Sequence, residues 1–214
     1  MILYVIEALR KLDFIEQIAV VGDKNKLSEL GGHIDLIIEQ GENLSQNIMK
    51  GAENFEDDDE LLVLSSDIPM ITPEALRDFV ERSRQYQADL YYPIVRKEKN
   101  EEKFPGVRRT YVKLKDGTFT GGNVFLVKVK TIKELLPKTE SFLAFRKKPW
   151  KLARILGLSF VIKFIMGTLT IAQVEKRAMD LFDIKGKAII SDYPEIGTDV
   201  DKPSDLELLS KVLS

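Results

Sequence analysis

The chain has 214 residues, of which 44% are hydrophobic and 31% charged, and its formal net charge is −2. This is an ordinary globular composition, and the length is enough to bury a continuous core. The absence of cysteine excludes a disulfide framework, a thiolate zinc site and a cysteine nucleophile, and the one histidine, His33, argues against a His-rich metal centre. The near-neutral charge argues against a general nucleic-acid binder.

The first half of the chain alternates short apolar segments with helical patterns. Residues 2–12 predict an amphipathic helix that carries Glu7, which does not suit a secretory signal, so a cytoplasmic location is the default expectation. Strands are predicted at 15–22, 33–41 and 60–69, with a helix over 45–54. A further helix is predicted after Thr72 as N-cap, with Pro73 at its first position. Such alternation is typical of parallel βαβ units.

The second half is richer in strands. The pattern predicts strands at 88–97, within 108–129 and at 185–191, with a turn at Lys115, Asp116 and Gly117. Helices are predicted at 131–136, within 145–179 and from Ser204 to Leu213. We therefore expect one α/β domain over 1–214, with a mixed, mostly parallel sheet, helices on both faces and added antiparallel strands.

Two acidic segments are candidate metal ligands. Asp67 follows the most hydrophobic predicted strand, and open α/β sheets bind ligands beyond the carboxyl ends of their strands. Asp201 lies in the extended approach to the last helix, near Asp199 and Asp205. Two carboxylates without histidine or cysteine suggest a hard ion such as Mg²⁺. The alternative is that these residues cap turns or are solvated.

Two further segments are candidate ligand contacts. Gly121 and Gly122 interrupt a strand pattern, which marks either a bulge or a close approach of ligand to backbone. Residues 39–47 form a strand-to-helix turn rich in amides and hydroxyls that could read a nucleotide base, although Asn43 or Ser45 would also make a good N-cap.

Together and in this order, the four segments resemble the nucleotidyltransferase superfamily, most closely its MobA-like NTP transferase domains. The resemblance implies a three-layer, Rossmann-like fold of the nucleotide-diphospho-sugar transferase type. Its Asp-x-Pro element is matched by Asp67-Ile68-Pro69 and its late acidic element by residues 200–206, which implies Asp67 and Asp201 as catalytic Mg²⁺ ligands. It also implies sites for the nucleotide and the acceptor. These comprise Gln40, Gly41, Asn47 and Ser65 for the nucleotide, and Gly121, Gly122 and Asn123 for the acceptor.

The implied activity is transfer of an NMP group from an NTP to a phosphate or hydroxyl acceptor, with release of pyrophosphate. One departure is the absence of the family's N-terminal strand and its L-A-G-G-x-G-x-R loop, whose backbone N–H groups would cradle the triphosphate. We expect poor or absent catalysis without it, and favour a start at an internal methionine over a natural remnant. The sheet should then show a gap or an exposed edge.

Two other functions stand as alternatives. A glycosyltransferase using a nucleotide sugar would need a D-x-D element after a strand, whereas Asp57-Asp58-Asp59 precedes one. A non-catalytic nucleotide-binding or scaffold domain would keep the base pocket without transfer chemistry.

The stretch 145–170 is basic and apolar, with no acidic residue between Ser141 and Val174. Lys163, Gly157 and Gly167 argue against a membrane span at 155–172. Packing on the sheet or on a second subunit in a homodimer is the favoured interpretation, and a lipid-facing helix is the alternative.

Overall fold

The computed structural model describes residues 1–144 and 149–200, with the backbone alone described for 140–144 and 149–152. Its helices are α1 Ile2–Arg10, α2 Lys24–Leu27, α3 Leu44–Ala52, α4 Pro73–Ser83, α5 Lys97–Lys103, α6 Val129–Ala144, α7 Pro149–Leu156, α8 Leu158–Ile165 and α9 Ile171–Phe182, with 3₁₀ helices η1 Ser28–Leu30 and η2 Pro194–Gly197. Its strands are β1 Ala19–Gly22, β2 Leu36–Glu39, β3 Glu60–Leu64, β4 Leu90–Arg96, β5 Val112–Leu114, β6 Gly117–Gly121, β7 Val124–Lys128 and β8 Gly186–Ser191.

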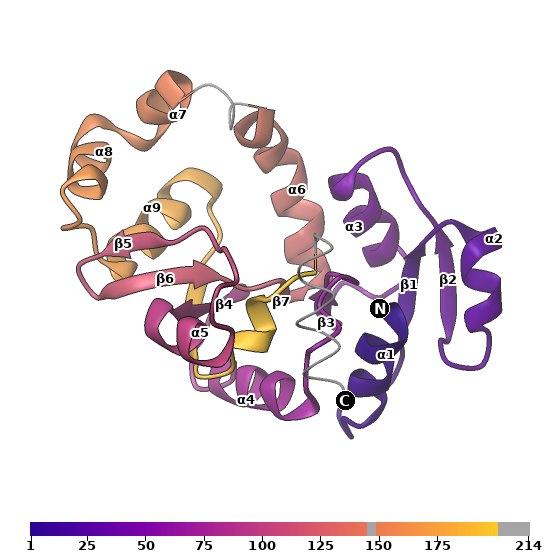
Figure 1. Cartoon of the computed structure of the whole chain (residues 1–214). Coiled ribbons are helices and arrows are strands. Elements are labelled where there is room, and N and C mark those ends of the chain that lie inside the picture. The colour runs from indigo at the N-terminus through magenta and orange to yellow at the C-terminus, as the bar shows by residue number, and fades with distance from the viewer. Residues whose placement is uncertain (145–148, 201–214) are drawn as a thin grey trace.

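The described strands form two sheets (Figure 1). β1 and β2 are a parallel pair, and a six-stranded sheet has the order β3-β7-β4-β6-β5 with β8 parallel to β4. The pairings give β3, β4, β5 and β8 one direction and β6 and β7 the other. Most strands of this sheet therefore share a direction, as predicted. Antiparallel ladders nevertheless outnumber parallel ones in this sheet, because β7 lies between β3 and β4 and β6 lies between β4 and β5.

The two sheets have open edges. Within residues 1–144 and 149–200, no ladder joins β1 to β3, and β3 is paired with β7 alone. The gap or exposed edge that the sequence predicts is thus present as a division between the β1–β2 pair and the larger sheet. Unpaired strand edges offer backbone N–H and C=O groups to further hydrogen bonding.

Helices cover both faces of the larger sheet, which makes three layers. The alternation of side chains along β3 shows this, because Leu62 and Leu64 pack in the cluster of α1 and α4, whereas Leu61 and Val63 pack in the cluster of α3 and α6. The fully buried Phe79 of α4 is one centre of the first cluster. A buried side chain of this size contributes about 1.5–3 kcal/mol to the free energy of unfolding.

The predicted elements are mostly confirmed, with differences at their ends. Thr72 caps α4 by accepting a hydrogen bond from the backbone N–H of Ala75 at 3.2 Å. The helix predicted at 131–136 begins at Val129 and extends through Pro137 as α6, and Val129 and Ile132 at its start are buried against α3. The sequence does not predict the short helices α2 and α5, because their polar segments lack an apolar period. The helix predicted from Ser204 lies outside the described residues.

The apolar stretch at 155–172 is divided among short elements. It contains the end of α7, all of α8, a turn at Gly167 and the start of α9. No helix in the two described ranges has both the length and the apolar composition needed to cross a bilayer.

Candidate functional site

The predicted metal and acceptor segments meet at one end of the larger sheet. β3 ends at Leu64, and β7 begins opposite it at Val124 because the two strands are antiparallel. The backbone N–H of Ser65 donates to the carbonyl of Asn123 at 3.1 Å. The turn after β3 and the segment before β7, which the sequence marks separately, are therefore hydrogen-bonded neighbours.

The chain after β8 reaches the same place. The backbone N–H of Asn123 donates to the carbonyl of Ile196 in η2 at 2.9 Å. Beyond η2, the backbone N–H of Val200 donates to the carbonyl of Asp67, also at 2.9 Å. Three segments far apart in sequence, Ser65–Asp67, Gly121–Asn123 and 196–200, thus form one site at the sheet end, which we call the sheet-end site.

Asp67 presents a half-buried carboxylate at the sheet-end site. The hydroxyl of Ser65 donates to its Oδ1. Asp201, the predicted second ligand, lies outside the described residues. Within the described ranges no three His, Cys, Asp or Glu side chains gather in a way that could hold a metal ion. Asp67 and Ser65 supply hard oxygen atoms, which are the donors that suit Mg²⁺.

The glycines of this site are explained by close backbone approach within the protein. A Cβ atom on Gly121 would overlap the hydroxyl of Tyr92, and one on Gly122 would lie 2.7 Å from Cγ of Pro93. A Cβ on Gly197 would lie 2.9 Å from the carbonyl oxygen of Gly121. Glycine is therefore needed here for packing. Asn123, in contrast, has a side-chain nitrogen Nδ2 that is buried without a hydrogen-bond partner in the described part of the chain.

A partly buried charge pair that the sequence did not reveal borders the site. Arg109 forms an ion pair with Asp199, and their side chains are 13% and 24% exposed. Nη2 of Arg109 also donates to the carbonyl of Gly121 at 3.4 Å. Burial raises the pKa of the nearby Tyr92 hydroxyl, and the positive charge of Arg109 acts in the opposite direction. Nothing in the spacing of Arg109 indicates its partner, because the two residues meet only in the folded chain.

Glu195 of η2 is a second residue that sequence reasoning missed. Its side chain is almost fully buried, and its carboxylate accepts hydrogen bonds from Oγ1 of Thr72 at 3.1 Å and from Nζ of Lys103 at 2.6 Å. Thr72 begins the helix that follows the Asp67-Ile68-Pro69 turn, and Lys103 ends α5. Glu195 therefore connects η2 to the turn that carries Asp67.

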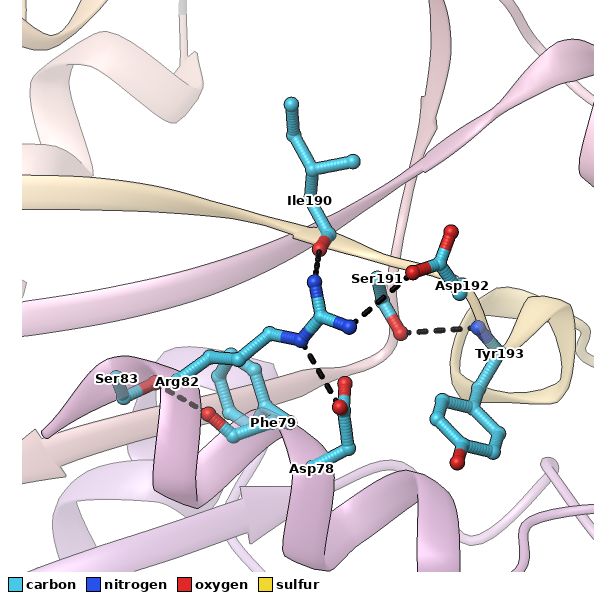
Figure 2. A network of polar contacts seen from close by, with 8 residues as sticks. All are labelled: Asp78, Phe79, Arg82, Ser83, Ile190, Ser191, Asp192 and Tyr193. Carbon is cyan, nitrogen blue, oxygen red and sulfur yellow. Dashed lines mark hydrogen bonds and ion pairs between the residues drawn. The ribbon is translucent and has the colours of Figure 1, made fainter. Parts of the chain in front are cut away.

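Arg82 of α4 fixes the other end of the η2 segment (Figure 2). Its guanidinium donates to Asp78 at 2.9 Å, to Asp192 at 3.1 Å and to the carbonyl of Ile190 at 3.4 Å. The hydrogen bond that Arg82 donates to Asp78 raises the pKa of Arg82 above its ordinary value, so the side chain stays charged. These hydrogen bonds attach the end of β8 and the residue after it, Asp192, to α4.

The predicted nucleotide-binding turn follows β2 and belongs to the smaller sheet. The backbone N–H of Gly41 donates to Oδ1 of Asn47 at 2.6 Å, and Nζ of Lys50 donates to the carbonyl of Gln40 at 3.1 Å. Asn43 caps α3, as one interpretation of the sequence expected. A Cβ on Gly41 would lie 2.6 Å from Cβ of Gln46. These side chains thus stabilise the turn itself, whereas Ser65 belongs to the sheet-end site.

The acidic run at 57–59 lies at the opposite end of β3 from Asp67. Asp57 pairs with Lys133 of α6 at 2.6 Å, and Asp59 accepts a hydrogen bond from the backbone N–H of Glu56 at 2.9 Å. These residues hold the entry to β3, away from the sheet-end site.

Comparison with known families matches residues 1–147 to the MobA-like NTP transferase domain. The chain belongs to this family. No curated protein matches it. Among solved structures, a hypothetical transferase from Thermus thermophilus is 36% identical, with a TM-score of 0.85 over 96% of this chain and 85% of that chain.

Two more distant structures share the fold of this MobA-like domain. The 2-C-methyl-D-erythritol 4-phosphate cytidylyltransferase of Francisella tularensis is 12% identical, with a TM-score of 0.62 over 99% of this chain and 88% of that chain. A CMP:2-keto-3-deoxy-manno-octonic acid synthetase complexed with CTP is 14% identical, with a TM-score of 0.63 over 99% of this chain and 86% of that chain. The Rossmann-like, three-layer α/β class predicted from the sequence is confirmed.

Proposed function

We propose that this MobA-like domain transfers an NMP group from an NTP to a phosphate or hydroxyl acceptor and releases pyrophosphate. The observation that carries the proposal is the meeting of Ser65–Asp67, Gly121–Asn123 and the chain up to Val200 at one sheet end. These are the segments in which the family resemblance places the metal and the acceptor. The fold is also that of a 2-C-methyl-D-erythritol 4-phosphate cytidylyltransferase and of a CMP:2-keto-3-deoxy-manno-octonic acid synthetase.

In the proposed reaction an acceptor oxygen attacks the α-phosphorus of the NTP in line with the leaving group. A new oxygen–phosphorus bond forms, and the bond between the α-phosphorus and the pyrophosphate oxygen breaks. Asp67 and Asp201 would hold Mg²⁺, which neutralises negative charge as the displacement develops. The hydrogen bond of Val200 to Asp67 supports this pairing, since Asp201 is the next residue in the chain.

The remaining predicted residues receive roles in the same proposal. Gln40, Gly41, Asn47 and Ser65 would line the nucleotide site. Gly121, Gly122 and Asn123 would lie along the acceptor. The buried Nδ2 of Asn123 supports this role, because a buried donor without a partner in the described chain is suited to an incoming oxygen. Arg109 would hold Gly121 and Asp199 in place.

The test measures pyrophosphate release and nucleotide binding with each of the four NTPs, with and without Mg²⁺ and with phosphorylated and hydroxylated acceptors. Pyrophosphate release with one acceptor class, or Mg²⁺-dependent NTP binding that Asp67→Asn weakens, supports the proposal. Tight binding of a nucleotide diphosphate sugar in preference to NTP would instead favour a glycosyltransferase. Weak, Mg²⁺-independent binding without pyrophosphate release would favour a non-catalytic nucleotide-binding domain.

The position of the acidic run argues against the glycosyltransferase alternative. A D-x-D metal site would have to use residues 57–59, which lie at the start of β3 and not at its carboxyl end. Asp57 is already paired with Lys133. These positions support Asp67, and not residues 57–59, as the proposed metal ligand.

A further inference from the structure

Helix α8 exposes an apolar stripe to solvent. Besides Phe164, which is 46% exposed, its most exposed large apolar side chains are Leu158 at 74%, Ile162 at 47% and Ile165 at 77%, and Met166, directly after the helix, is 69% exposed. These positions are spaced i, i+4, i+7 and i+8, so they lie on one face of the helix. We call this face the α8 stripe.

This orientation is the reverse of an ordinary amphipathic helix. In α4, residues with similar spacing, such as Ala75, Leu76, Phe79 and Val80, are buried in the core. No residue of α8 is buried, although the helix is apolar at nearly every position. Figure 1 shows α8 at the end of the molecule opposite β1 and β2. A contiguous exposed apolar face of this kind marks an interaction surface.

The charges around the α8 stripe are basic. Lys163 lies in α8 itself and Arg154 lies in the adjoining α7, and both are exposed. The stem of Lys113 on β5 approaches the turn at Gly167, where an added Cβ would meet it at 3.4 Å. The sequence from 141 to 174 contains no acidic residue. The carboxylate of Asp116 accepts a hydrogen bond from the backbone N–H of Ile171 at 2.9 Å.

We propose that the α8 stripe docks on a membrane surface that contains anionic lipids. The apolar side chains would enter the boundary between headgroups and acyl chains, and Arg154 and Lys163 would contact the lipid phosphates. A second copy of the chain is a poorer occupant, because a symmetric contact through this face would bring the basic residues of both copies together. The helix lies on the membrane and does not cross it.

The experiment is co-sedimentation of the whole chain with vesicles of phosphatidylcholine alone and with vesicles of phosphatidylcholine and phosphatidylglycerol. We expect binding to the anionic vesicles that falls as salt rises. The double variant Ile162→Ser with Ile165→Ser should weaken vesicle binding by about tenfold or more, because it loses the free energy of moving two apolar side chains from water into the membrane boundary. Lys163→Glu should weaken it by about fivefold or more, because one lipid contact becomes repulsive.

A matched control uses apolar side chains exposed elsewhere. Leu3 and Tyr4 of α1 are 40% and 44% exposed. The double variant Leu3→Ser with Tyr4→Ser should bind vesicles as the unchanged chain does. Equal loss in both double variants, or no sedimentation with anionic vesicles, would overturn the proposal. So would a concentration-dependent dimer, seen by analytical ultracentrifugation, that the α8 variant abolishes without any vesicle binding by the unchanged chain.

Discussion

The backbone N–H of Val200 donates to the carbonyl of Asp67 at 2.9 Å, although the two residues lie far apart in the sequence. Asp67 follows β3, and Val200 follows η2. The position of η2 is fixed by the hydrogen bond between Thr72 and Glu195 and by that between Arg82 and Asp192, which follows β8. The carbonyl of Asp67 therefore fixes the late segment, while its carboxylate accepts a hydrogen bond from the hydroxyl of Ser65 and is the metal ligand that we propose. Backbone and side chain of one residue thus serve two purposes.

Asp67→Asn should separate these purposes. The variant keeps the backbone carbonyl for Val200 and a side-chain oxygen for Ser65, so its melting temperature without ligand should be unchanged or slightly higher. Mg²⁺-dependent NTP binding should fall by about tenfold or more, because a charged ligand becomes neutral. Calorimetry with and without Mg²⁺ measures this.

Asp58→Asn is the matched control for that experiment, since Asp58 belongs to the acidic run at the other end of β3. Its nucleotide binding should equal that of the unchanged chain. A fall of several degrees in the ligand-free melting temperature of Asp67→Asn would identify Asp67 as a structural cap. A loss of Mg²⁺-dependent nucleotide binding in Asp58→Asn would indicate that residues 57–59, and not Asp67, bind the metal.

Glu195→Gln should reduce the free energy of unfolding and disturb the position of η2 at the sheet-end site. Glutamine keeps a hydrogen bond to Thr72 but removes the charge that Lys103 contacts at 2.6 Å, so we expect a loss of about 1–3 kcal/mol in the free energy of unfolding. Denaturant unfolding measures that loss. NTP affinity should fall in Glu195→Gln at temperatures where the variant is fully folded, because Glu195 positions η2 and the turn of Asp67.

The control for Glu195 is Lys103→Met, which removes the ion pair while leaving the carboxylate in contact with Thr72. The side chain of Lys103 is 46% exposed, so its ammonium group is largely in contact with water. Removing it leaves the carboxylate of Glu195 as a buried charge without its ion-pair partner. If NTP affinity in Glu195→Gln equals that of the unchanged chain, Glu195 acts on stability alone and is not a positioning residue.

The parts of the fold that the sequence predicts correctly are those whose signals are local. A hydrophobic run followed by an acidic turn predicts that a strand ends shortly before Asp67, and Thr72 with Pro73 predicts the start of α4. Both signals are local, because caps and strand ends depend on neighbours in sequence. The order of these signals also indicated the MobA-like family. The placement of β7 between β3 and β4 could not be predicted from them, since strand order depends on pairing between distant segments.

The contacts that hold the candidate site together had no such signal. Arg109 pairs with Asp199, and Glu195 with Thr72 and Lys103, only after the chain has folded. The two glycines at 121 and 122 did signal a close approach, but the approaching groups are Tyr92 and Pro93 of the protein. Sequence spacing shows that space is needed there and does not show what fills it.

Gly121→Ala should destabilise the fold by about 1–3 kcal/mol, because the added methyl group meets the ring of Tyr92 and overpacks the region. Tyr92→Phe in the same chain should recover part of that loss, since it removes the hydroxyl that overlaps most with the new Cβ. Thermal unfolding of both single variants and of the double variant measures the coupling. If the losses of stability in the two single variants simply add up in the double variant, the side chain of Tyr92 moves away from the new methyl group at no cost.

The last prediction concerns acid stability and the pair formed by Arg10 and Asp35. The guanidinium of Arg10 contacts Asp35 at 2.8 Å, and the backbone N–H of Ile18 donates to the same carboxylate, so the pKa of Asp35 is lowered, chiefly by Arg10. A carboxylate whose pKa is lower in the folded state stabilises the fold above its unfolded pKa of about 3.9, and the contribution disappears as the pH falls through its folded pKa. The difference in unfolding free energy between the unchanged chain and Asp35→Asn should therefore be constant at neutral pH and shrink in acid. Denaturant unfolding across this pH range measures it, and in an Arg10→Met background the acid dependence of the difference should be weaker. A difference that grows as the pH falls would contradict the assignment, because it would require a raised pKa.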